Sequence, residues 1–214
     1  MRGNMVKDKK EQARKLTPAE EKRLARFEAA AEELSARGYK RTDLTVGIVK
    51  ANVFAIAISL PVIGVGLWLF YLKNGFSGGR FSGIWTLPVL IVLTIAHELV
   101  HGLGWSLYTP NGFRDMEFGF IRQYLTPYCA CCAPLGKGQY IVGALAPLVI
   151  VGVIPAAAGI LWGSFFWTLT GLVMILGAAG DIIIVKNILA YKTEAKDILY
   201  MDHPTQAGGV IFEK

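Results

Sequence analysis

Long apolar runs alternate with polar stretches along most of this chain. Four runs reach the length, about 20 residues, that a helix needs to cross a bilayer. They cover residues 51–72, 85–108, 140–162 and 165–191. Pro147 and Pro155 interrupt the third run, and the short Gly163-Ser164 link predicts a tight hairpin between the last two. The pattern predicts an all-α polytopic membrane protein with about four transmembrane helices.

The polar segment before the first run is strongly basic. Residues 1–50 hold 13 of the 22 Lys and Arg residues, so the net charge of +6 describes a basic flank and not a nucleic-acid-binding surface. By the positive-inside rule we expect both termini in the cytosol, in a multi-pass protein of the cell membrane. Thr17-Pro18-Ala19-Glu20 predicts the start of a helix that Gly38 ends. The predicted division is a basic helical flank at residues 1–45 and a membrane-embedded domain at residues 46–214.

The segment between the second and third runs is rich in β-forming residues. Residues 116–125 predict a small β-hairpin beside the bundle, and Pro127 and Gly136 predict turns. Such a hairpin can bind an unwound peptide substrate as an added strand. A plain cytosolic connector is the alternative.

Three cysteines, Cys129, Cys131 and Cys132, follow in the same segment. In the cytosol these thiols stay reduced. A second metal site formed with His203 is the less favoured alternative, because three clustered thiols lack the paired spacing of structural zinc modules. The segment Asp202-His203-Pro204 is more typical of a turn.

The second run contains His97-Glu98-Leu99-Val100-His101, an H-E-x-x-H motif. Histidines four residues apart lie on one face of a helix, where both rings can bind one metal ion. Glu98 is then close enough to reach a water on that ion. A carboxylate at this depth is costly without a cation, which favours a zinc enzyme over histidines that only hydrogen-bond across a bundle. A haem site is a weaker alternative, because axial histidines usually come from different helices.

Catalytic zinc generally has three protein ligands. Asp181 is the acid in an otherwise apolar stretch of the fourth run, and it lies within about two helical turns of the depth of His97 and His101. The small residues 177–180 allow two membrane helices to approach closely. Asp181 is therefore the predicted third ligand. An ion pair between Asp181 and Lys186 is the alternative, but residues five apart face different sides of a helix.

These residues resemble those of the zincin peptidase family, bacterial multi-pass membrane proteins with an H-E-x-x-H motif in a membrane helix. More distantly, the chain is similar to the site-2 intramembrane zinc metalloproteases. The resemblance runs from about residue 39 to the tail and rests on residues 97–102, 125–135, 145–148 and 180–181. It implies His97 and His101 as metal ligands and Asp181 as the third ligand. It also implies Glu98 as the catalytic acid and base.

Two features depart from the site-2 proteases. Those enzymes typically place a glycine after their ligand aspartate, whereas Gly180 precedes Asp181 here. Their internal Asn-Pro element is absent, and the nearest match is Ala146-Pro147. These differences concern substrate handling more than metal binding.

The predicted function is a membrane-embedded zinc metallopeptidase that hydrolyses peptide bonds of membrane or membrane-proximal substrates. The expected cofactor is Zn²⁺, and the expected partners are the lipid bilayer and a peptide or transmembrane-segment substrate, with no nucleic acid. The alternative is a non-hydrolytic metal-binding membrane protein, either a transporter component or a scaffold. Transporters commonly show internal repeats, which this sequence lacks. A protein that only binds a metal ion would also not require Glu98, so this residue favours the peptidase.

Overall fold

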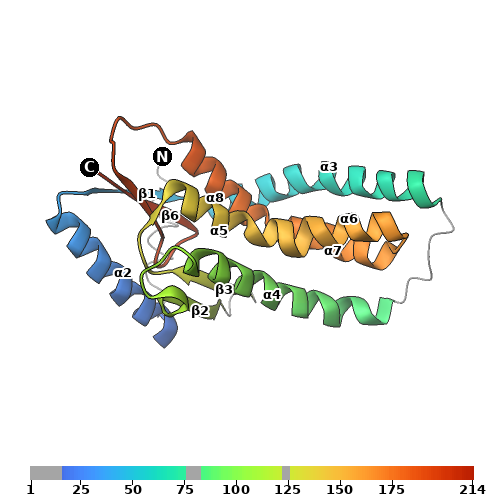
Figure 1. Ribbon diagram of the computed structural model, residues 1–214, viewed down its shortest axis with the longest axis horizontal. Coiled ribbons are helices and arrows are strands. Elements are labelled where there is room, and N and C mark those ends of the chain that lie inside the picture. Colours follow the sequence, from blue (N-terminus) through green and yellow to red (C-terminus); the bar gives the residue numbers. More distant parts are fainter. Residues whose placement is uncertain (1–15, 76–82, 122–125) are drawn as a thin grey trace.

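Figure 1 shows the computed structural model of the chain, which describes residues 16–75, 83–121 and 126–214. Long helices lie side by side at one end of the molecule, and two sheets with helix α2 lie at the other end. The helices are α2 (Pro18–Ala36), α3 (Ile48–Asn74), α4 (Thr86–Ser106), α5 (Lys137–Pro147), the π-helix η4 (Leu148–Val153), α6 (Ile154–Trp162), α7 (Phe165–Gly177) and α8 (Ala179–Ala190). The strands are β1 (Lys40–Thr45), β2 (Met116–Ile121), β3 (Thr126–Cys131), β4 (Leu135–Gly136), β5 (Ile198–Asp202) and β6 (Gly208–Glu213).

Three helical stretches in the described part of the chain are long and apolar enough to cross a membrane. They are Val53–Asn74, Gly83–Ser106 and Lys137–Trp162. Many of their large apolar side chains point outward, and Trp162 is 81% exposed. The third stretch continues from α5 through η4 into α6, where prolines remove backbone donors and the helix adopts a π-type turn. The first three predicted runs are thus helices.

The fourth predicted run, 165–191, is not one straight helix. It forms α7 and α8, which are bent by 44° relative to each other, and the number of candidate spans is four if this pair counts as one. The break falls at Ala178, whose backbone angles (φ −78°, ψ 2°) lie outside the helical region. Gly177 and Gly180 flank it, and glycine weakens a helix interior. The bend therefore places Asp181 in the first turn of a new helix.

The C-terminal segment corrects the all-α prediction. Strands β5 and β6 join β1 and β4 in an antiparallel four-stranded sheet with the order β1-β6-β5-β4. Consecutive residues Val210 and Ile211 of β6 are both fully buried. They are buried because apolar clusters cover both faces of this sheet. A short strand buried on both faces lacks the alternation by which strands are recognised, so the prediction missed it.

The four-stranded sheet connects the long apolar helices to α2. On one face, Tyr200 and Ile211 belong to the core that surrounds Trp105 of α4. On the other face, Phe212 packs in a cluster with Phe27 of α2. The helix α2 thus packs against the sheet that covers the ends of the helices.

Helix α2 begins as predicted. The Thr17 side chain accepts a hydrogen bond from the Glu20 amide, and the Glu20 carboxylate accepts one from the Thr17 amide. Farther along α2, Arg26 donates hydrogen bonds to Glu117 (2.8 Å) and Asp115 (3.2 Å) beside the hairpin. These contacts attach the basic flank to the segment that follows α4.

The predicted hairpin between the second and third runs is confirmed. Strands β2 and β3 pair antiparallel, from Met116↔Cys131 to Ile121↔Thr126. Its turn lies outside the described residues. Pro127, which was predicted to mark a turn, instead pairs with Phe120 in the ladder, and Gly136 is the N-cap of α5. Strand β3 packs alongside α4, which carries the H-E-x-x-H motif.

Candidate metal centre

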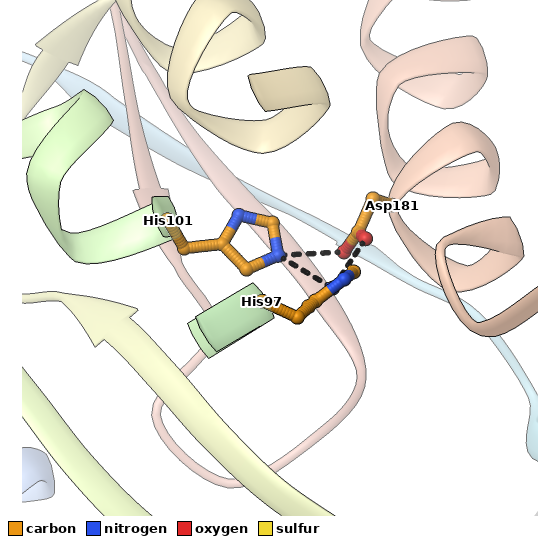
Figure 2. Close-up of side chains that lie close together, drawn as sticks. All are labelled: His97, His101 and Asp181. Atoms are coloured by element: carbon orange, nitrogen blue, oxygen red, sulfur yellow. Dashed lines mark hydrogen bonds and ion pairs between the residues drawn. The ribbon is translucent and has the colours of Figure 1, made fainter. Parts of the chain in front are cut away.

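The structure brings the three predicted ligands together. His97 and His101 lie one turn apart on α4, and both are buried, with 7% and 4% exposure. Asp181 points at them from the first turn of α8 (Figure 2). The Nε2 atom of His97 lies 3.3 Å from one Asp181 oxygen, and the Nε2 atom of His101 lies 3.5 Å from the other. The two Nε2 atoms are 3.2 Å apart.

These separations fit a zinc ion. Tetrahedral zinc with bonds of about 2.0–2.1 Å holds its ligand atoms roughly 3.3–3.4 Å apart. The two histidine nitrogens are 3.2 Å apart, close to one edge of such a tetrahedron, and they lie 3.3 and 3.5 Å from the two different oxygens of the Asp181 carboxylate. One ligand atom from each of the three residues lies within 4.8 Å of the others. Two imidazoles and a carboxylate are also a donor set that zinc accepts. Among the described residues, these three are the group of acidic, histidine or cysteine side chains close enough to share one ion.

The ring of His101 is oriented by a backbone carbonyl of α5. Its Nδ1 lies 3.0 Å from the Gly143 oxygen, and because a carbonyl can only accept, Nδ1 carries the proton. The Nε2 lone pair is then directed toward His97 and Asp181, which is the tautomer that metal ligation requires.

Two sequence features make this hydrogen bond available. Pro147 has no amide hydrogen, so the intrahelical bond that would normally occupy the Gly143 carbonyl is missing. Glycines also let the two helices touch, because a Cβ added at Gly104 would lie 3.0 Å from the Gly143 Cα. The free carbonyl and the close crossing together place an acceptor against the His101 ring.

Glu98 lies beside the three predicted ligands and does not belong to the group that could share one ion. It is half-buried on α4, and its carboxylate interacts electrostatically with both histidines and with Asp181. The backbone of Cys129 on β3 lies within hydrogen-bonding reach of it. A carboxylate adjacent to the predicted ligands and near a neighbouring strand is suitably placed for proton transfer at the centre.

The alternative partners considered for Asp181 and His203 lie elsewhere. The Lys186 ammonium sits 4.4 Å from the centre of the Phe54 ring, and the ion pairs of Asp181 are with the two histidines. The Nδ1 atom of His203 accepts hydrogen bonds from the amides of Thr205 and Gln206, as in the predicted turn.

The cysteines pack in the protein and do not form a second group of metal ligands in the described part of the chain. Cys131 is 2% exposed within the core around Trp105. Burial raises the pKa of Cys132 to about 11, although the nearby Arg26 lowers it. Burial likewise raises the pKa of Cys129 and of Cys131. Protonated thiols are poor metal ligands.

The sequence analysis missed the residues that pack behind His101. The Gly143 carbonyl and the Trp105 ring both contact the His101 ring. Tyr140 in turn contacts Trp105, and Asp202 contacts Tyr140. One signal was present in the sequence, since Trp105 follows His101 by four residues and so shares its helix face. Pro147, four residues after Gly143, was the other. Asp202 gave no signal beyond that of a turn.

Comparison with known proteins supports the type of site. The family whose description is "Putative zincin peptidase" matches residues 90–196, half of the chain, including the motif and Asp181. No curated protein and no solved structure matches the chain. The similarity to site-2 proteases stays a prediction.

Proposed function

The chain belongs to the zincin peptidase family, and from that premise we propose that it is a membrane-embedded zinc metallopeptidase. The observation that carries the proposal is the convergence of two imidazoles and a carboxylate, with ligand atoms within 4.8 Å of one another, beside a further glutamate. The proposed ligands are His97, His101 and Asp181, and the proposed acid and base is Glu98.

Membrane embedding is supported by the surface of the helices. Large apolar side chains on α3 and α4 are widely exposed, among them Leu60 (62%), Val92 (64%) and Leu103 (57%). Soluble proteins rarely expose continuous apolar surfaces of this extent. Because His97 and His101 belong to the same helix as these side chains, the proposed reaction takes place at or below the membrane surface.

Each residue has one proposed role in hydrolysis. A zinc ion, when bound, supplies a Lewis acid that polarises the peptide carbonyl and lowers the pKa of water. Glu98 removes a proton from the attacking water, whose oxygen forms a bond to the carbonyl carbon. The same carboxyl group then gives that proton to the amine as the C–N bond breaks. Asp181 and the two histidines hold the centre, and the Gly143 carbonyl keeps the His101 ring in place.

The proposed substrate is an extended peptide in or near the membrane. Strand β3 belongs to the two-stranded ladder and packs against α4, with its Cys129 backbone near Glu98. An unwound segment added along this hairpin would bring its backbone to the reacting groups. Peptide bonds within a helix have their polar groups already paired, so unwinding precedes cleavage.

The test replaces Glu98 with Gln and measures zinc content and cleavage together. The purified full chain is reconstituted with single-span membrane reporter peptides, and products are identified by mass spectrometry. We expect Glu98→Gln to keep its zinc and to lose cleavage, whereas Asp181→Ala loses both. Glu33→Gln, at an exposed position on α2, is the matched control and keeps both. Continued cleavage by Glu98→Gln would show that this site does not hydrolyse the reporter.

A further inference from the structure

The C-terminal sheet contributes a buried carboxylate close to the proposed centre. Asp202, the last residue of β5, lies six positions beyond the residues that the family matches. One of its oxygens accepts a hydrogen bond from the Tyr140 hydroxyl, and the other accepts one from the Cys131 amide at 2.8 Å. The same side chain therefore joins α5 to β3.

The contact with Tyr140 continues to His101 without a break. Tyr140 is 1% exposed, and its backbone carbonyl accepts a hydrogen bond from the Trp105 indole N–H at 2.9 Å. The Trp105 ring, itself 3% exposed, stacks on the His101 ring with 5.0 Å between centroids and 12° between planes. Because all three side chains are closely packed, the position of one limits the positions available to the next.

The contact with Cys131 leads to the opposite side of the centre. It fixes strand β3, whose Cys129 backbone lies within hydrogen-bonding reach of Glu98. One carboxylate thus holds the two elements that flank the centre, α5 beside His101 and β3 beside Glu98.

We propose that Asp202 and Tyr140 are positioning residues for the metal centre, which set the plane of the His101 ring through Trp105. The inference rests on the proposed function, since it presupposes that His101 is a metal ligand. Outer partners of ligating histidines orient the ring and raise metal affinity, and their loss typically weakens binding by about 10- to 100-fold. A structural hydrogen bond of the same kind elsewhere in the fold would affect stability alone.

The chain offers a matched control for that distinction. The Tyr39 hydroxyl likewise donates a hydrogen bond to an aspartate, Asp197, and the two residues directly precede strands β1 and β5 of the four-stranded sheet. Tyr39 packs in the cluster with Phe27, on the side of the sheet away from Trp105. Tyr39→Phe therefore removes an equivalent tyrosine–aspartate contact without touching the path to His101.

The experiment measures Co²⁺ binding to the purified full chain in detergent, by competition with a chromophoric chelator and by the visible absorption of the bound ion. We expect Tyr140→Phe to weaken Co²⁺ binding by about tenfold, the lower end for such partners, and to shift the visible bands. Tyr39→Phe should leave affinity and bands unchanged even where it lowers the unfolding temperature. Trp105→Phe keeps an aromatic ring but removes the N–H donor, so it should also weaken binding and shift the bands.

The outcomes separate the inference from the proposed function. If the wild type binds Co²⁺ and His101→Ala does not, the result supports the proposed metal centre. Equal affinities and spectra for wild type, Trp105→Phe and a folded Tyr140→Phe would then overturn the positioning role alone. If Tyr140→Phe does not fold, Trp105→Phe decides the question by itself. A wild type that binds no Co²⁺ would overturn both.

Discussion

Replacing Gly143 with alanine is the sharpest perturbation of the proposed centre. A methyl carbon at this position would lie 2.6 Å from Cγ of Trp105 and closer still to Cδ1 and Nε1. Carbon atoms in good contact are about 3.5–4.0 Å apart, so the indole or the helix must move by roughly 1.5 Å. Either movement disturbs the His101 ring, which is stacked on Trp105 and hydrogen-bonded to the Gly143 carbonyl.

Three contributions determine how much Gly143→Ala should change the free energy of unfolding. Overpacking of a buried site costs about 1–3 kcal/mol. Moving the indole also removes the N–H from the Tyr140 carbonyl, and a buried group left without its partner costs about 1–3 kcal/mol. Alanine is favoured over glycine within a helix by about 1 kcal/mol, which offsets part of this loss. We expect Gly143→Ala to lower the free energy of unfolding by about 1–5 kcal/mol.

The assay compares thermal unfolding in detergent with Co²⁺ affinity. Gly64→Ala in α3 is the control, because a Cβ at Gly64 has no neighbour within 4 Å. We expect the control to match the wild type in affinity and to be no less stable. Gly143→Ala should be less stable and bind Co²⁺ more weakly. If it equals the control in both measurements, the tight packing of Trp105 against α5 does not maintain the centre.

Three further predictions concern metal removal, Pro147 and pH. A ligand at about 100 times its dissociation constant stabilises the folded state by about 2.7 kcal/mol, so a chelator should lower the unfolding temperature of the wild type but not of Asp181→Asn. Pro147→Ala supplies an amide that competes for the Gly143 carbonyl; it should stabilise the helix yet weaken Co²⁺ binding, and unchanged affinity would exclude competition. Burial lowers the pKa of His203 below 6.5, so the folded state takes up the proton less readily than the unfolded chain. The unfolding temperature should therefore stay constant above pH 6.5 and decrease as the pH is lowered below 6.5. His203→Asn should lose this pH dependence, and an identical pH profile in the variant would contradict the assignment.

The basic flank shows which features can be predicted from neighbouring residues and which cannot. The capping box at Thr17 and Glu20 forms as predicted, because both partners belong to the same turn of helix. The attachment of α2 to the hairpin was not predicted. It depends on Arg26 meeting Asp115 and Glu117, which are about 90 residues away, and no local pattern encodes such a meeting.

The hydropathy pattern could not predict the four-stranded sheet, for a related reason. Strand β6 pairs with β1 from the other end of the chain, in a register from Lys40↔Glu213 to Thr45↔Gly208. Both faces of β6 are covered, so its apolar residues show no period of two. The bend at Ala178 was hidden because a hydropathy window measures composition and is insensitive to backbone angles.

By itself the sequence determined the apolar helices and the hairpin, and it predicted the candidate centre from the paired histidines, Glu98 between them and Asp181. These depend on spacing within a helix or on the cost of burying a carboxylate in an apolar segment, and both can be judged from neighbouring residues. Only the tertiary structure showed that Gly143 and Trp105 contact His101 and that Tyr140 and Asp202 follow behind Trp105. Their contacts join helices and strands far apart along the chain, and side chains at such distances are brought together by packing alone.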